Sequence, residues 1–190
     1  MTQAMISIRQ RPSSSVKGRP NPSAPAACLA AVQEGALERV NVLLREGVAV
    51  NWQDKVGCSL LFHAIFRRHF AIAEELLARG ANIDLADQRG WTPLFWAAFN
   101  DHVDIVGFLA AHHADTNVAT HEGDRPLFMA AYKGHAEVAR LLLAGGAQWD
   151  AVDPDGRDAL WVAGMMGHDE IVKLLEARAV APAGPLPDTH

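Results

Sequence analysis

The chain has 190 residues, 49% of them apolar, and a formal net charge of −5. This length suits one domain or a short repeat array, and the apolar share excludes a chain that is disordered throughout. The first twenty residues hold four basic residues and no acidic one, so the remainder is more acidic than the chain as a whole. Because an acidic body repels phosphate backbones, the composition argues against nucleic acid as the main partner.

The N-terminal segment, residues 1–24, is rich in Ser and Pro. It lacks the apolar run of a secretory signal, and no stretch approaches the roughly 20 apolar residues that a membrane helix needs. We therefore expect disordered tails at 1–24 and 180–190 and a cytoplasmic protein with no membrane partner. The basic tail also loosely resembles bacterial secretion leaders. A second hypothesis is therefore an effector delivered into a host cell by a specialised secretion system.

The two cysteines, Cys28 and Cys58, are isolated in the sequence. They form no CxxC pair, and we find no familiar Cys/His zinc spacing around them. Two single cysteines do not make a disulfide framework, which favours a reducing compartment. We expect no metal site and no cofactor.

A 33-residue repeat is the main signal in the sequence. Its markers are four glycines at that spacing, an acidic or polar residue three positions before each glycine, and a histidine twelve positions after it. The glycines are Gly57, Gly90, Gly123 and Gly156; the residues before them are Asp54, Asp87, Thr120 and Asp153; the histidines are His69, His102, His135 and His168. Such a register predicts stacked copies of one structural unit.

Each unit reads as a turn followed by two short helices. In the third unit, residues 87–90 form the turn, and Thr92 is an expected N-cap before a helix that starts at Pro93. After a break at residues 100–101, apolar residues at helical spacing predict a second helix over about 103–111. Leu109 in this helix and Leu141 in the next unit are expected to face the core. One such helix pair cannot bury its apolar face alone, so the units must stack.

The sequences GWTPLFWAA at residues 90–98 and GHAEVARLLLAGGA at residues 134–147 resemble the ankyrin-repeat signature. The resemblance covers roughly residues 25–179. It implies an all-α solenoid of helix–turn–helix units joined by β-turn or hairpin loops. The expected repeats span about residues 25–53, 54–86, 87–119, 120–152 and 153–179. The first repeat is degenerate, which suits a terminal capping unit.

The sequence departs from this family pattern at three kinds of position. Aromatic residues replace the histidine that follows Pro-Leu in the family, and we expect them to form a buried ladder: Phe62, Phe95, Phe128 and Trp161. Where Thr92 caps its helix, the fourth unit has Arg125, which cannot act as a cap, and the fifth has Asp158, which can. His113 replaces a glycine in a left-handed turn, at a cost of about 1 kcal/mol. The junction of units three and four is therefore expected to be the weakest.

Candidate binding residues lie nine positions after each turn glycine. They are Phe66, Phe99, Tyr132 and Met165. The resemblance places them at the ends of the inner helices, facing a concave groove. Such an apolar strip is typical of an interaction site, although the side chains could instead pack on neighbouring hairpins. Hairpin-tip candidates are Trp91 and Arg89. A polar rim could be formed by Arg67, Asn100 and Lys133, for which a solvated edge is an equal alternative.

The histidine series is not expected to bind a metal. Equivalent positions in stacked repeats lie about 10 Å apart, whereas zinc ligands converge to about 2 Å from one ion. The resemblance gives these histidines a structural place at the start of the second helix. The sequence also lacks a phosphate-binding glycine loop, a nucleophile elbow and a zinc-protease motif. We therefore predict a monomeric, non-catalytic module that binds another protein.

Overall fold

The computed structural model describes residues 23–180; the two expected tails lie almost entirely outside this range. The described residues form ten helices and no strand. The helices are α1 (Ala24–Glu34), α2 (Leu37–Arg45), α3 (Leu60–Phe66), α4 (Phe70–Ala78), α5 (Pro93–Phe99), α6 (Val103–Ala111), α7 (Pro126–Lys133), α8 (Ala136–Ala144), α9 (Ala159–Met166) and α10 (Asp169–Val180). No helix in the described part of the chain has both the length and the apolar character to cross a bilayer.

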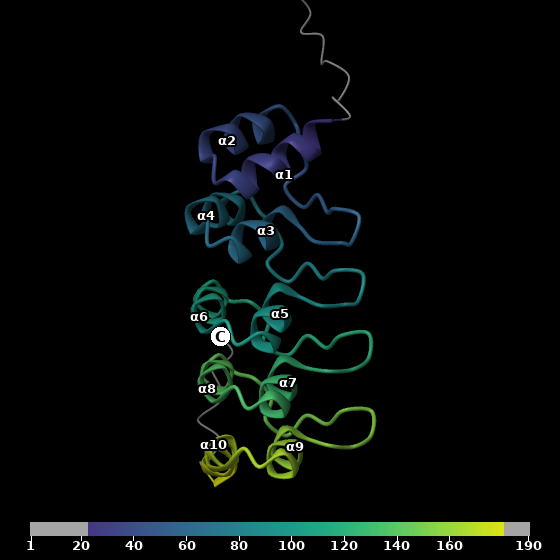
Figure 1. The fold of residues 1–190 in the computed structure, drawn as a ribbon, viewed down its shortest axis with the longest axis vertical. Helices are drawn as coiled ribbons and strands as arrows, with labels where there is room; N and C mark the ends of the chain where they lie inside the picture. Colours follow the sequence, from purple (N-terminus) through teal and green to yellow (C-terminus); the bar gives the residue numbers. More distant parts are fainter. Residues whose placement is uncertain (1–22, 181–190) are drawn as a thin grey trace, which may run out of the picture.

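The helices stack as five antiparallel pairs in one elongated array (Figure 1). The odd-numbered helices form one row and the even-numbered helices form the other, and the long loops project beyond the odd-numbered row. We call the odd-numbered row the inner row and the even-numbered row the outer row. This arrangement is the all-α solenoid that the sequence predicts.

Local capping explains where the inner helices begin. The hydroxyl of Thr92 accepts a hydrogen bond from the backbone amide of Phe95, and the carboxylate of Asp158 accepts one from the amide of Trp161. Each bond satisfies an amide that has no partner within its helix. The side chain of Arg125 makes no such bond. The three capping predictions are therefore confirmed.

The core lies between the two rows. Each inner helix has an alanine at the same register position, and this small side chain lets the outer helix approach closely. These alanines are all 0% exposed: Ala31, Ala64, Ala97, Ala130 and Ala163. Leu109 is fully buried as predicted; Leu141 is half-buried and packs against the core, whereas its neighbour Leu142 is 1% exposed. The 33-residue register accounts for this, since Leu142 is the position equivalent to Leu109.

Left-handed backbone occurs at non-glycine residues in two kinds of turn. His113 has φ +60°, where equivalent turns use glycine, so this prediction is confirmed. Arg68 and Asp101 have φ +58° and +57° in the turn between the inner and outer helices. The equivalent positions of the three other repeats hold Gly35, Gly134 and Gly167. Such a conformation costs about 1 kcal/mol in a residue with a Cβ.

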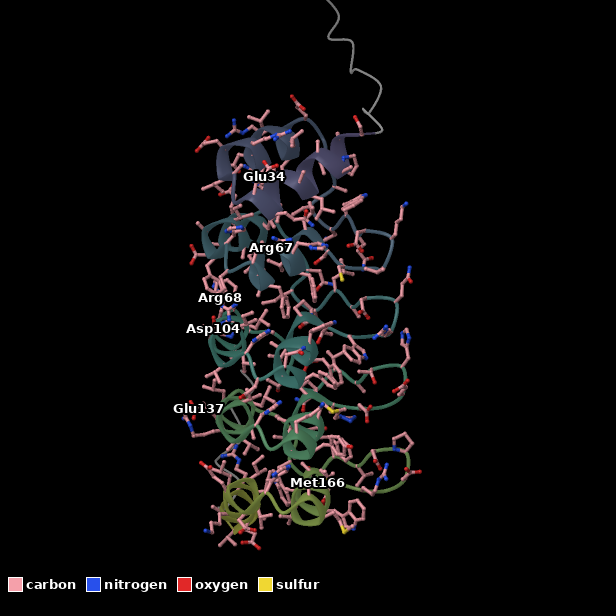
Figure 2. The ribbon with its side chains drawn as sticks, in the orientation of Figure 1. Glu34, Arg67, Arg68, Asp104, Glu137 and Met166 are labelled. Carbon is pink, nitrogen blue, oxygen red and sulfur yellow. The ribbon has the colours of Figure 1, made fainter. Side chains whose placement is uncertain are left out.

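The widest junction lies between repeats two and three. Helices of neighbouring repeats approach closely elsewhere, but α3 lies farther from α5 and α4 farther from α6 (Figure 1). Aromatic rings occupy part of this space, including Phe70 of α4 and Phe108 of α6, whose centroids are 4.9 Å apart. Arg68 and Asp104 form an exposed ion pair of 2.8 Å across the same junction (Figure 2). The junction of repeats three and four is closely packed, so the weakness expected there from the His113 turn stays a prediction.

The aromatic ladder is only partly core. Phe95 is 1% exposed, and Phe62 and Phe128 are half-buried, but Trp161 is 48% exposed. The prediction is thus wrong for Trp161. Its helix, α9, is the last inner helix within residues 23–180, so no further repeat packs against the ring there; the guanidinium of Arg157 lies 5.7 Å from it.

Candidate functional site

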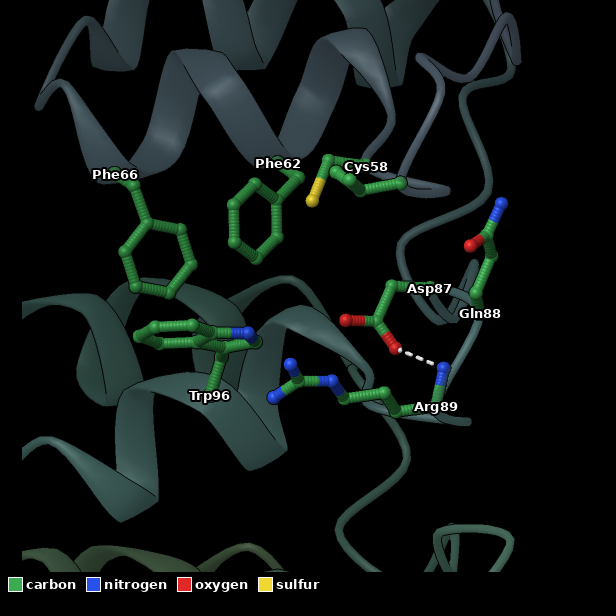
Figure 3. Close-up of a pocket in the computed structure, with 8 residues that line it drawn as sticks. Cys58, Phe62, Phe66, Asp87, Gln88, Arg89 and Trp96 are labelled. Atoms are coloured by element: carbon green, nitrogen blue, oxygen red, sulfur yellow. Dashed lines mark hydrogen bonds between the residues drawn. The ribbon is translucent and has the colours of Figure 1, made fainter.

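A cavity of about 460 Å³ opens between repeats two and three. It lies where the inner helices α3 and α5 meet the projecting loops of their repeats (Figure 3). Its lining residues are Val56, Cys58, Phe62, Phe66, Asp87, Gln88, Arg89 and Trp96. The wide junction thus contains an aromatic floor and a polar edge.

Three aromatic rings form the floor of this cavity. Phe62 and Phe66 are stacked at 4.4 Å between ring centroids, because they lie one helical turn apart on α3. Trp96 of α5 meets Phe62 and Phe66 edge-on, at 6.1 Å and 5.8 Å. Edge-to-face and offset-stacked contacts are favourable beyond their buried area. The floor therefore holds its shape through contacts that span the two repeats.

The polar edge is held by hydrogen bonds within and between the loops. The carboxylate of Asp87 accepts the backbone amide of Arg89 at 2.8 Å (Figure 3). The side-chain amide of Gln88 donates to the carbonyl oxygen of Lys55 in the preceding loop, also at 2.8 Å. These bonds fix the loop backbone. Asp87 and Arg89 both line the cavity, so it presents one acidic and one basic side chain.

The predicted strip divides into two halves. Phe66 and Phe99 are half-buried among the rings of Phe62, Trp91 and Trp96, which we call the aromatic cluster. Tyr132 is 44% and Met165 67% exposed. Phe66 packs against Phe62 and Trp96, which lie on inner helices, and Phe99 packs against Trp91 in the loop of its own repeat. At Tyr132 and Met165 the strip remains open to solvent. Binding by these four residues remains a prediction.

The tip and rim candidates have different surroundings. Trp91 is half-buried, with its ring 5.0–5.7 Å from the rings of Phe95, Trp96 and Phe99; Arg89 lies 5.5 Å from the Trp91 ring. The ammonium of Lys133 lies 4.3 Å from the ring of Phe99, a cation–π contact.

Asn100 and Arg67 complete the rim. The side-chain amide of Asn100 donates to the carbonyl oxygen of Trp96 at 2.8 Å, so its amide closes the end of α5. Arg67 is exposed at the end of α3. Of the three rim candidates, Arg67 and Lys133 thus present exposed charges, whereas Asn100 has a structural contact.

The histidine series connects adjacent repeats. The Nε2 atoms of His69, His135 and His168 lie 3.2–3.3 Å from the backbone carbonyl oxygens of Gln33, Phe99 and Tyr132. Each carbonyl belongs to the inner helix of the preceding repeat. His102 lies 5.8 Å from the ring of Phe66. The histidines are therefore spread along the stack in structural positions.

One group that the sequence analysis missed lies beside the cavity. The carboxylate of Asp54 accepts the backbone amides of Val56 and Cys58, both at 2.9 Å, and its other oxygen is 2.8 Å from Nε2 of His63. Burial raises the pKa of Asp54, but these hydrogen bonds outweigh burial, so the pKa of Asp54 is lowered overall. Burial, followed by the charges of Asp54 and Asp87, raises the pKa of the Cys58 thiol to about 11. In the sequence, the sign of this group was the spacing of four residues from Asp54 to Cys58 and five from Cys58 to His63. This spacing fits no common zinc motif.

Comparisons with known proteins bear on the repeat architecture. A family model described as ankyrin repeats, in three copies, matches residues 28–120 and 108–181. A comparison with curated proteins gives no significant match. Ankyrin repeats are generally protein–protein interaction modules. The two matched ranges cover well over half of the sequence and include all the repeats seen in the structure, so the chain belongs to the ankyrin-repeat family.

Proposed function

We propose that this protein is a non-catalytic adaptor that binds a partner protein along its inner row, with the cavity between repeats two and three as the main anchor point. The supporting observation is the cavity itself, which combines the rings of Phe66 and Trp96 with the charged side chains of Asp87 and Arg89. An apolar centre with a polar rim is the usual anatomy of a protein interface.

The chemistry of the rim suggests what the partner presents. Arg89 and Lys133 are exposed cations that lie against the rings of Trp91 and Phe99, and Arg67 is exposed at the end of α3. A segment with a large apolar side chain flanked by acidic residues complements this surface. The apolar side chain would enter the cavity, and the acids would meet the cations. Because the rings and loops are already held in place, little ordering is needed on binding.

The test compares capture by charge-matched variants. The first variant, called the groove variant because it alters the proposed binding surface along the inner row, carries Arg89→Glu and Lys133→Glu. Both positions are exposed. The control carries Arg45→Glu and Lys173→Glu, which are exposed on the outer helices α2 and α10. Truncating Phe66 or Phe99 is less suitable, because both contribute to packing. Circular dichroism would first establish that both variants retain the helical content of the unmodified chain.

Each bait is then incubated with extract of the source cell, and bound proteins are identified by mass spectrometry. We expect a partner that the unmodified chain and the control retain and the groove variant loses. Equal retention by all three baits would contradict the groove assignment, and an absence of any partner would contradict the adaptor role. The alternative, delivery into a host cell, depends on residues 1–24, almost all of which lie outside the described residues.

A further inference from the structure

We propose that Asp54, Cys58 and His63 together bind one divalent cation of the zinc class. The first two residues belong to the loop of repeat two, and the third lies on α3. This site is distinct from the partner-binding role, although Cys58 also lines the cavity.

The three donor atoms already lie close together. A carboxylate oxygen of Asp54, the sulfur of Cys58 and a ring nitrogen of His63 are all within 4.8 Å of one another. Around a tetrahedral zinc ion, bond lengths of about 2.0–2.3 Å place such atoms about 3.3–3.6 Å apart. The carboxylate–imidazole distance of 2.8 Å would open, while the distances to sulfur are at most 4.8 Å. The changes needed to reach zinc geometry are therefore below about 1.5 Å.

The local backbone already orients the carboxylate. Because one oxygen of Asp54 accepts two loop amides, the other is directed at His63. The hydroxyl of Ser59 accepts the amide of Phe62 at 3.0 Å and caps α3, which sets the position of the next residue, His63. Hydrogen bonds that orient ligands in this way raise metal affinity.

Comparison among the repeats supports a specific site. Repeat three holds Asp87, Trp91 and Trp96 at the equivalent positions, repeat four holds Thr120, Asp124 and Met129, and repeat five holds Asp153, Arg157 and Val162. The side chains of Asp153 and Arg157 form a 2.8 Å hydrogen bond, so the fold brings the first two positions into contact. Repeat two alone fills all three positions with metal-binding residues. A carboxylate–imidazole hydrogen bond that stiffens the loop would account for Asp54 and His63 but not for Cys58.

The charges and donor types fit zinc. A carboxylate and a thiolate supply two negative charges, which balance a divalent ion, and neutral imidazole completes the set. Sulfur and nitrogen donors favour zinc over magnesium or calcium, which prefer oxygen. Asp87 also lines the cavity beside Cys58 and adds negative potential there. Three protein ligands leave a fourth position for water.

The experiment uses the full chain without a polyhistidine tag. Zinc affinity is measured by competition with a chromogenic chelator, and Co²⁺ serves as a spectroscopic probe, since a thiolate ligand gives a charge-transfer band. We expect one ion per chain and a thiolate band. Cys58→Ser and His63→Gln should each weaken zinc binding by more than about 100-fold, because even the loss of a supporting contact around a metal ligand costs 10–100-fold. Cys28→Ala and His112→Gln are the matched controls and should bind normally.

Two results would overturn the site. One is zinc affinity in Cys58→Ser within tenfold of the unmodified chain. The other is a Co²⁺ complex of the Cys28→Ala protein without a thiolate band, since Cys58 is then the one remaining cysteine. This second readout needs no substitution at the site, so it decides the matter even where a ligand variant fails to fold.

Discussion

The Nε2 atom of His135 lies 3.2 Å from the backbone carbonyl oxygen of Phe99, thirty-six residues earlier in the chain. His69 and His168 make the same contact with their preceding repeats. The carbonyl groups at the end of a helix have no partner within the helix. In this protein the imidazole that precedes an outer helix supplies one, and it thereby couples neighbouring repeats.

Replacement of His135 by Ala should lower the free energy of unfolding by about 1–3 kcal/mol. The carbonyl oxygen of Phe99 then loses its partner in a half-buried place. Urea unfolding followed by circular dichroism gives the value. His121→Ala, at an exposed loop position, is the control and should change stability by less than about 0.5 kcal/mol. Equal losses in the two variants would show that the contact between repeats contributes nothing.

Leu142→Ala should cost about 2–5 kcal/mol, because Leu142 is fully enclosed between the rows. The neighbouring Leu141 is half-buried, so Leu141→Ala removes the same atoms from a less enclosed position and should cost clearly less. Chemical denaturation of both variants measures the difference. A larger loss for Leu141→Ala would mean that α8 presents a different face to the core.

His113→Gly should raise the free energy of unfolding by about 0.5–1 kcal/mol, because glycine adopts φ +60° without a Cβ penalty. The reverse test is Gly146→Ala, at the equivalent turn with φ +91°. Nothing lies within 4 Å of the added Cβ there, so any loss reflects the backbone alone. Thermal unfolding of both variants should shift in opposite directions; shifts of the same sign would refute the strain argument.

Asp153 should make stability depend on acid pH. Burial raises its pKa, but hydrogen bonds from the Arg157 side chain and the Arg157 and Asp155 amides outweigh burial and lower it overall. Its contribution is therefore complete above the unfolded value of about 3.9 and is lost as the pH falls through the lower folded value. At neutral pH, Asp153→Asn should have a lower free energy of unfolding than the unmodified chain. This gap between the two proteins should close in acid. A gap that stays constant with pH would contradict this linkage.

The repeat register predicted the fold because every unit repeats the same local signals. The second helix of the third unit was expected over residues 103–111, and α6 has those bounds. The side chains that depend on neighbouring units were less predictable. Trp161 occupies the same register position as Phe95, but exposure depends on what packs against each ring.

The candidate sites were likewise hard to predict from the sequence, because they depend on contacts between segments. The aromatic residues were visible in the sequence, but the cavity depends on how Phe62, Phe66 and Trp96 separate two repeats. The convergence of Asp54, Cys58 and His63 depends on how the loop folds back against α3. The sequence shows their order, whereas this three-dimensional contact decides their chemistry.

The wide junction between repeats two and three has a consequence for local unfolding. In a linear array, each unit is held by its nearest neighbours, so the least closely packed boundary defines where cooperative segments separate. Residues 23 to about 86 should therefore open as one segment while the remaining three repeats persist. Amide hydrogen exchange would then show two levels of protection along the chain, with the step at the aromatic boundary.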